Sequence, residues 1–275
     1  MPLIVTLRDL DRAAPLGIDL GGILPHVVGG LSLQTIARLT VRADERPCSF
    51  GDLVTLSGDP TDGRIECHGD FSRVHRLAAG MSEGRIDVHG SIGRHAGAGM
   101  TGGILAIHGD ANDWLAAGMA GGTIRVAGGT GDNAAAALPG NDTGMLGGIV
   151  VVAGDAGSLA GARMRRGILA IGGGCGEAPA FELRAGTVVV GGRVGAHPAV
   201  GMRRGSLVAL SDVPAVPPTF VRGAAWQPAF LPLMLSRLIA AGFPAVPGLS
   251  GGPWRQWHGD GLAGGRGELL HPESG

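Results

Sequence analysis

Apolar residues return at a fixed interval through the middle of the chain. In each repeat a glycine opens a short apolar run and a second glycine closes it. The opening glycines are Gly63, Gly84, Gly103, Gly122, Gly148, Gly167 and Gly186, and Gly205 begins an eighth, incomplete unit. Their spacings are 21, 19, 19, 26, 19, 19 and 19 residues. A fixed period of this size is typical of a solenoid, in which each unit buries its apolar face by stacking on its neighbours.

The apolar positions inside each unit predict one β-strand per repeat. The third and fifth residues are mostly β-branched, for example Ile86 with Val88 and Val150 with Val152. Side chains two residues apart share one face of a strand, and no helical period competes with this alternation. Left-handed helices of hexapeptides favour coils of about 18 residues, which the observed period does not fit. We therefore predict an all-β fold, a right-handed parallel β-helix over residues 51–210.

Methionines form a second regular feature of the repeat. Six of the eight occupy the position three residues before an opening glycine, and leucine takes it once: Met81, Met100, Met119, Met145, Met164, Leu183 and Met202. A methionine stripe can be an adaptable binding surface, but inside a repeat it is more often core. We predict that these side chains fill the interior.

The region before the repeat, residues 1–50, is interpreted as an N-terminal cap. Residues 3–7 predict a strand, 19–30 a glycine-rich loop, and 32–43 a short helix or strand. Residues 50–58 repeat the glycine–alternation–glycine form and are expected to be the first rung or a cap of the stack. The long fourth unit carries seven extra residues within 132–143, which predicts a loop at one corner.

Residues 211–275 leave the pattern and predict an extension that packs on the solenoid and on partners. Residues 211–219 are proline-rich and should form an extended connector. Residues 229–241 have helical spacing and predict a helix over one end or flank, and 242–275 read as loop-rich. The outward strand positions of the later coils, such as Ile149 and Ile168, are apolar. An apolar outer face must be covered, so this helix and a further polypeptide of an assembly are both expected there.

Composition indicates the type of source organism and the cellular location, but not the function. The chain has 53 glycines, no tyrosine, and only arginine among its 22 Lys and Arg residues, a bias typical of a GC-rich bacterial genome. A net charge of −1 gives no general attraction for nucleic acid or an anionic membrane. Three cysteines form no disulfide framework. Neither a signal peptide nor an apolar stretch long enough to cross a bilayer is recognisable, which favours the cytoplasm.

Two polar stripes are the candidates for chemistry. His68, His89 and His108 recur at the sixth position of three units and should stack on the outside of the coils. A metal or proton-relay site is one interpretation; a simple surface stack is favoured, since no carboxylate or cysteine recurs beside them in a clear ligand pattern. The sequence also contains no established catalytic motif. Its one G-x-G-x-x-G match arises from the repeat, so it does not indicate nucleotide binding. We therefore predict no catalytic, cofactor-binding or metal-binding residue in this chain.

The second stripe is an arginine ladder, which we define as Arg165, Arg184 and Arg203. Like charges at coil spacing repel unless an anion or an acidic surface offsets them. Solvated arginines with local acidic partners are one interpretation. A docking site for an acidic partner or a polyanionic ligand is the other.

The repeat resembles the β-helical domain shared by the glutamate synthase large chain and the C subunit of formylmethanofuran dehydrogenase. The units have the form G-x-I-x-V-x-G and end in G-M-x-x-G. The flanks favour the dehydrogenase family: residues 50–58, 218–220, and the tail W-H-G-D at 257–260 followed by G-G-R-G-E-L-L at 264–270. Departures are Arg266, where lysine is usual, and the loss of Gly-Met at 183–184.

The resemblance, with the lysine-free composition, implies the family's bacterial form in the formyltransferase/hydrolase complex of methylotrophs. It implies a hetero-oligomer with formyltransferase, amidohydrolase-like and dehydrogenase-like subunits in tetrahydromethanopterin-linked formaldehyde oxidation. The dinuclear metal, furan coenzyme and tetrahydromethanopterin are expected in partner subunits, and this chain is expected to be a non-catalytic scaffold. The alternatives are the C subunit of a tungsten or molybdenum formylmethanofuran dehydrogenase, or a free-standing domain related to glutamate synthase.

Overall fold

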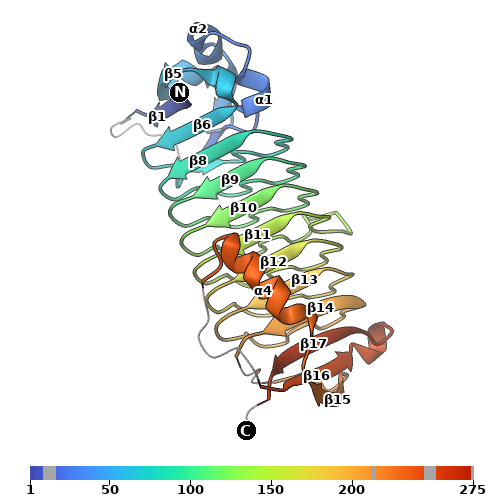
Figure 1. Ribbon diagram of the computed structural model, residues 1–275. Helices are drawn as coiled ribbons and strands as arrows, with labels where there is room; N and C mark the ends of the chain where they lie inside the picture. Colours follow the sequence, from blue (N-terminus) through green and yellow to red (C-terminus); the bar gives the residue numbers. More distant parts are fainter. Residues whose placement is uncertain (9–16, 212, 214, 245–251, 274–275) are drawn as a thin grey trace.

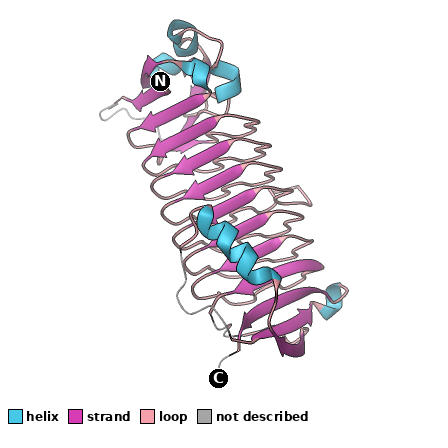
Figure 2. Ribbon diagram, in the orientation of Figure 1, coloured by secondary structure: helices cyan, strands magenta, loops and turns pink. Residues whose placement is uncertain are grey.

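The protein is an elongated, mainly β structure organised around one long sheet (Figure 1). The computed structural model describes residues 1–8, 17–211, 213, 215–244 and 252–273. Their main sheet has 13 strands in the order β15-β16-β17-β14-β13-β12-β11-β10-β9-β8-β6-β1-β5. Strand order follows chain order from β6 to β14, apart from β7, and Figure 2 shows that loops connect most of these strands.

The repeat strands pair in parallel and without offset. Ile65 pairs with Ile86, and Ile86 with Leu105, so equivalent positions of successive repeats lie side by side. The predicted stacking of one parallel strand per repeat is confirmed. The strands are β6 (Arg64–His68), β8 (Arg85–His89), β9 (Ile104–Ile107), β10 (Thr123–Val126), β11 (Ile149–Val152), β12 (Ile168–Ile171), β13 (Thr187–Val190) and β14 (Arg204–Ala209).

A second column of pairing runs along the return segments. Single parallel bridges join equivalent residues of neighbouring repeats: Phe71, Ile92, Ala111, Thr130, Ala156 and Cys175. Between this column and the next strand, left-handed backbone recurs at alternate residues, as at Arg76, Ala78 and Gly80. The alternation lets N–H groups bond to both neighbouring coils, as Gly97 bonds to Leu77 and Gly99 to Ala117.

The methionine ladder explains the opening glycines. All six methionines and Leu183 are fully buried, so the prediction of core packing is confirmed. The methyl group of Met119 lies 2.7 Å from where a Cβ of Gly148 would stand, and Met100 fills the same place at Gly122. Both glycines also have positive φ, which L side chains disfavour. One coil thus inserts a side chain into a space that glycine leaves in the next.

The first rung differs from the expectation. β1 (Leu3–Leu7) lies parallel to β6 and occupies the first place in the stack, as a strand predicted from its sequence. Residues 50–58 form a helical turn, α3 (Phe50–Leu53), and then β5 (Val54–Gly58), which runs antiparallel to β1 at the sheet edge. Their interpretation as a rung of the repeat is wrong, because Asp52 completes a capping box with Ser49 that starts a helix instead. The alternative interpretation, a cap of the stack, agrees with the place of β5 at the sheet edge.

A smaller sheet and short helices complete this end. The sheet has the order β4-β3-β2-β7, and residues 32–43 contain both a helix and a strand. The loop predicted at 19–30 contains a short helix that begins at a proline. The elements are β2 (Ile18–Asp19), α1 (Pro25–Val28), α2 (Leu33–Ala37), β3 (Thr40–Ala43), β4 (Arg46–Ser49), η2 (Pro60–Asp62) and β7 (Val74–His75).

The predicted late helix, α4 (Phe230–Ala240), lies across the outer face of the later strands (Figure 1). Leu231 and Leu238 pack in a buried cluster with Val151, Ala170 and Val189, which point outward from the sheet. The expectation that the chain's own helix covers this apolar face is confirmed.

The segment after α4 is not loop-rich. It contains β16 (Trp254–Gly259) and β17 (Arg266–Pro272), which extend the main sheet together with β15 (Val221–Trp226), a strand that precedes α4. β17 pairs parallel to β14, and β16 pairs antiparallel to both β17 and β15. Glycines obscured this pattern, yet two of them are required by close packing. A Cβ at Gly259 would meet the Phe220 ring at 2.4 Å, and one at Gly267 would meet the Met202 sulfur at 2.3 Å.

Asp260 fixes the turn between β16 and β17. Its carboxylate accepts hydrogen bonds from the N–H groups of Gly201 at 3.1 Å and Leu262 at 2.9 Å, where it caps η3 (Gly261–Ala263). Burial by itself would raise the pKa of Asp260. These hydrogen bonds, with one from the Thr219 hydroxyl, outweigh it and lower the pKa below the ordinary 3.8.

The seven extra residues of the fourth repeat form a protruding loop. Residues 137–147 contain no helix or strand, and Gly140, Asn141 and Asp142 are exposed. The strands on either side, β10 and β11, still pair in the same register as the other repeats. The insertion therefore leaves the stack unchanged, as predicted.

We expect Met119→Ala to destabilise the fold by about 2–5 kcal/mol, because it leaves a cavity beneath Gly148. Denaturant unfolding followed by circular dichroism would measure this. Leu146→Ala is the matched control, because Leu146 is 41% exposed and its loss should change stability by less than about 0.5 kcal/mol. Equal effects of the two substitutions would contradict the core assignment of the ladder.

We expect Asp260→Asn to lower stability by about 1–2 kcal/mol at neutral pH, because a neutral amide accepts these hydrogen bonds less strongly. Since the folded-state pKa is lowered, this contribution is present above pH 3.8 and is lost as the pH falls through the folded-state pKa. Unfolding curves at about pH 7 and about pH 3 should show the difference between the proteins shrink in acid. Glu83→Gln, which neutralises an exposed carboxylate, should show no such difference; a pH-independent defect in Asp260→Asn would refute the assignment.

Candidate functional site

The strongest polar constellation lies on the outer face of β6 and β8. Parallel pairing places Glu66 beside Asp87 and His68 beside His89. Residues two apart on a strand share a face, so two carboxylates and two imidazoles form a grid. His108, which directly follows β9, adds a third imidazole. We call these five residues the histidine–carboxylate grid.

The imidazole rings form a continuous stack. The ring centroids of His68 and His89 are 4.3 Å apart with planes at 10°, and those of His89 and His108 are 5.1 Å apart at 2°. The predicted surface stack is confirmed. All three rings remain 41–54% exposed.

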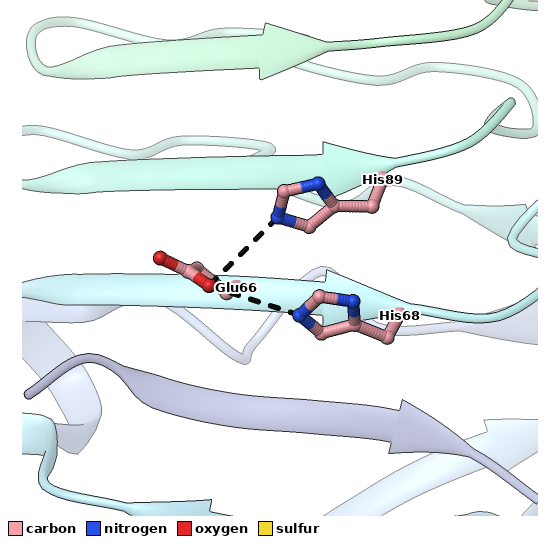
Figure 3. A group of neighbouring side chains, drawn as sticks. All are labelled: Glu66, His68 and His89. Carbon is pink, nitrogen blue, oxygen red and sulfur yellow. Dashed lines mark ion pairs between the residues drawn. The ribbon is translucent and has the colours of Figure 1, made fainter.

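Glu66 lies where two of the rings converge (Figure 3). Its Oε2 is 3.7 Å from His68 Nε2 and 3.8 Å from His89 Nε2. The potential ligand atoms of the three residues all lie within 4.8 Å of one another. The expectation that no carboxylate or cysteine recurs beside the histidines in a clear ligand pattern is wrong for Glu66. The signal for it was the same-face spacing of Glu66 with His68 and of Asp87 with His89.

Asp87 is held by an arginine of its own strand. Arg85 donates two hydrogen bonds to the Asp87 carboxylate, at 2.6 and 2.5 Å, and the Asp87 side chain is only 8% exposed. Burial opposes ionisation, but Arg85 overcomes it and holds the pKa of Asp87 below its usual range. Asp87 Oδ1 lies 4.0 Å from His108 Nε2. The hydrogen bonds between Arg85 and Asp87 fix the position of the Asp87 carboxylate and offset its charge.

Cys67 does not belong to the grid despite its place between Glu66 and His68. Its side chain points to the opposite face and is fully buried in the core. Burial raises the pKa of the thiol strongly, and the nearby Asp87 and Glu66 carboxylates add to the effect. A thiol in this environment stays protonated and is not available as a metal ligand.

The arginine ladder is brought together by the stack. The three are placed at equivalent corners, because their N–H groups donate to equivalent carbonyls of the preceding coil, those of Met145, Met164 and Leu183. Arg184 lies 3.9 Å from Asp142 of the protruding loop. Within the described part of the chain, Arg165 and Arg203 form no ion pair. The structure therefore supplies one weak acidic partner for three stacked charges.

A ladder of Asp and Ser side chains was missed in the sequence. Each oxygen accepts a backbone N–H from the following coil, as Asp110 does from Gly129 at 2.8 Å and Asp155 from Gly174 at 2.7 Å. Asp113, Asp132 and Ser158 act in the same way. The period-19 recurrence of Asp113 and Asp132 was the signal. These hydrogen bonds give the Asp and Ser side chains a structural role, the joining of successive coils.

A cavity of about 340 Å³ lies beside the terminal turn. Its lining includes His197, Val216, Pro217, Pro218 and Asp260. The Asp260 carboxylate is already committed to hydrogen bonds that hold the turn. Apart from His197, the cavity therefore offers mainly apolar contacts.

Within the described ranges, the only group of three His, Cys, Asp or Glu residues with ligand atoms close enough for one metal ion is Glu66, His68 and His89. No helix in the described part of the chain has the length and hydropathy needed to cross a membrane. The grid thus stands out as a possible cation site, and the arginine ladder as a possible anion or partner site.

Comparisons with known proteins identify a relative across nearly the whole structure. No family model matches the sequence. The C subunit of the formyltransferase/hydrolase complex Fhc from Methylorubrum extorquens is 36% identical over 89 residues, a segment that spans 32% of this chain and 33% of that protein. A chain in the crystal structure of the FhcABCD complex from the same organism, determined with methylofuran, superposes with a TM-score of 0.90 and 34% identity. That match covers 98% of this chain and all of the other.

Proposed function

The chain belongs to the family of the C subunit of the formyltransferase/hydrolase complex, and on this premise we propose that it is a non-catalytic scaffold in such a complex. Full coverage of a chain from FhcABCD at TM-score 0.90 carries this proposal. The finer architecture in this proposal is a right-handed parallel β-helix, divided at about residues 50 and 210.

The partners in this proposal are formyltransferase, amidohydrolase-like and dehydrogenase-like subunits. The complex would pass a formyl group from tetrahydromethanopterin to a furan coenzyme and release it as formate. The dinuclear metal, the furan coenzyme and tetrahydromethanopterin would be bound by those partners. Exposed apolar side chains near the C-terminal end support a covered surface there: Val221, Trp226, Phe230, Leu233, Ile239 and Leu262.

Two alternative functions predict different experimental results. The C subunit of a formylmethanofuran dehydrogenase would purify in a complex that contains tungsten or molybdenum. A free-standing domain related to glutamate synthase would bind ligand or show activity by itself. The match over the full length of a chain from FhcABCD favours a complex subunit over a free-standing domain.

We expect the tagged chain, expressed in its native host, to co-purify with the three other kinds of subunit. Native mass spectrometry of the eluate would give their identity and stoichiometry, and elemental analysis would detect tungsten or molybdenum. An untagged strain is the control for carry-over. Purification of the chain alone under mild conditions would overturn the scaffold proposal.

The arginine ladder is proposed to dock an acidic partner surface or a polyanionic ligand. We expect Arg165→Ala, Arg184→Ala and Arg203→Ala together to reduce co-purification several-fold, because they remove three stacked charges at one corner. The control combines Arg46→Ala, Arg73→Ala and Arg193→Ala, which removes the same charge from exposed sites elsewhere. An intact complex with the first variant, or equal loss with both, would exclude this role.

A further inference from the structure

We propose that Glu66, His68 and His89 form a binding site for one divalent transition-metal ion of the zinc class. The proposal concerns this chain's own surface and is independent of the proposed scaffold role. It rests on where the ligand atoms converge, how freely the rings can adjust, and how the surrounding charges are balanced.

The donor atoms already converge on one point. Both imidazole Nε2 atoms lie 3.7–3.8 Å from the same oxygen of Glu66. In a tetrahedral site with metal–ligand distances of about 2.0–2.2 Å, ligand atoms are about 3.2–3.5 Å apart. The pairs that involve Glu66 need to contract by only a few tenths of an ångström. Parallel pairing of β6 and β8 supplies this arrangement without a loop rearrangement.

The rings have room to turn toward a common ion. A metal lies close to the plane of each imidazole that binds it, so the two stacked rings must tilt from their present 10°. Their side chains are 41% and 42% exposed. Among the described residues, the ring nitrogens of both histidines have no hydrogen-bond partner, so a tilt breaks no existing bond. The cost is limited to part of the ring stacking.

The surrounding charges permit a cation. Two arginines, Arg64 and Arg85, lie next to the site. The charge of Arg85 is paired with Asp87 through two hydrogen bonds, and Arg64 is exposed to solvent, which screens its charge. Glu66 therefore remains as an acceptor whose ion-pair contacts are the two histidines. Two nitrogens and one carboxylate oxygen favour zinc-class ions over magnesium or calcium, which prefer oxygen ligands. The exposed side of the site leaves a coordination position open to water or to a neighbouring protein.

His108 provides a matched control within the same stack. It is 54% exposed and lies parallel to His89, yet its close carboxylate is Asp87 rather than Glu66. The proposal therefore requires His68 and His89 but not His108. A non-specific attraction of metals to stacked surface histidines would depend on all three alike.

Isothermal titration of the full, tag-free chain with zinc chloride, after removal of metals by a chelator, tests the site. We expect one Zn²⁺ per chain and no saturable heat with Mg²⁺. His68→Ala, His89→Ala and Glu66→Gln should each weaken zinc binding by more than the about 10- to 100-fold typical for loss of a supporting residue. His108→Ala should bind as the wild type does, and circular dichroism melting should confirm that each variant is folded.

Cobalt provides a readout that does not depend on any variant. Co²⁺ added to the wild-type chain should produce visible d–d absorption bands that one equivalent of Zn²⁺ removes. Absence of saturable zinc binding by the wild type, or binding that survives both His68→Ala and His89→Ala, would overturn the proposal. An equal loss in His108→Ala would also overturn it, because that result would reflect general attraction to surface imidazoles.

Discussion

Hydrogen bonds between successive coils are the interaction on which the rest of the structure depends. Few backbone groups are satisfied within a single coil, because strands, corners and return segments all bond to the coils on either side. A coil can therefore exist only at a fixed register with its neighbours. This requirement explains the constant period, and it explains why the seven extra residues protrude instead of lengthening a strand. The same register places chemically related side chains in columns.

The sequence predicts features that follow from apolar periodicity, and it does not predict features that depend on local capping or on contacts between distant residues. The repeat strands, the buried methionines and α4 were predictable because apolar periodicity determines them directly. For residues 50–58 the glycine spacing imitates a repeat and left both a rung and a cap open; the Ser49–Asp52 capping box begins a helix, and β5 lies at the sheet edge as a cap. The terminal strands were missed because Gly259 and Gly267 are required by contacts with Phe220 and Met202, which lie far away along the chain.

Part of the candidate site was predictable from the sequence. Three histidines at one repeat position predicted the stack, and the structure contains it. The convergence of two rings on Glu66 depends on side-chain conformation, and the pairing of Asp87 with Arg85 decides which carboxylate remains available. The sequence alone shows only that Glu66 and His68, and likewise Asp87 and His89, lie two residues apart and so share a strand face. The outer face is thus divided: charged and wet over β6 and β8, apolar and covered by α4 over the later strands.

Antiparallel pairing occurs near both ends of the main sheet: β5 pairs with β1 at one end, and β16 pairs with β17 and β15 at the other. A stack of identical parallel coils has no intrinsic length, since its last coil offers the next copy the same template as every coil before it. At each end the chain's own reversed strand, β5 or β16, occupies the position that a further copy would need. The caps therefore act as terminators that keep the protein from growing end to end into a fibre. They also make the distance between its ends a fixed property of the sequence, counted in coils, against which other proteins of an assembly can be positioned.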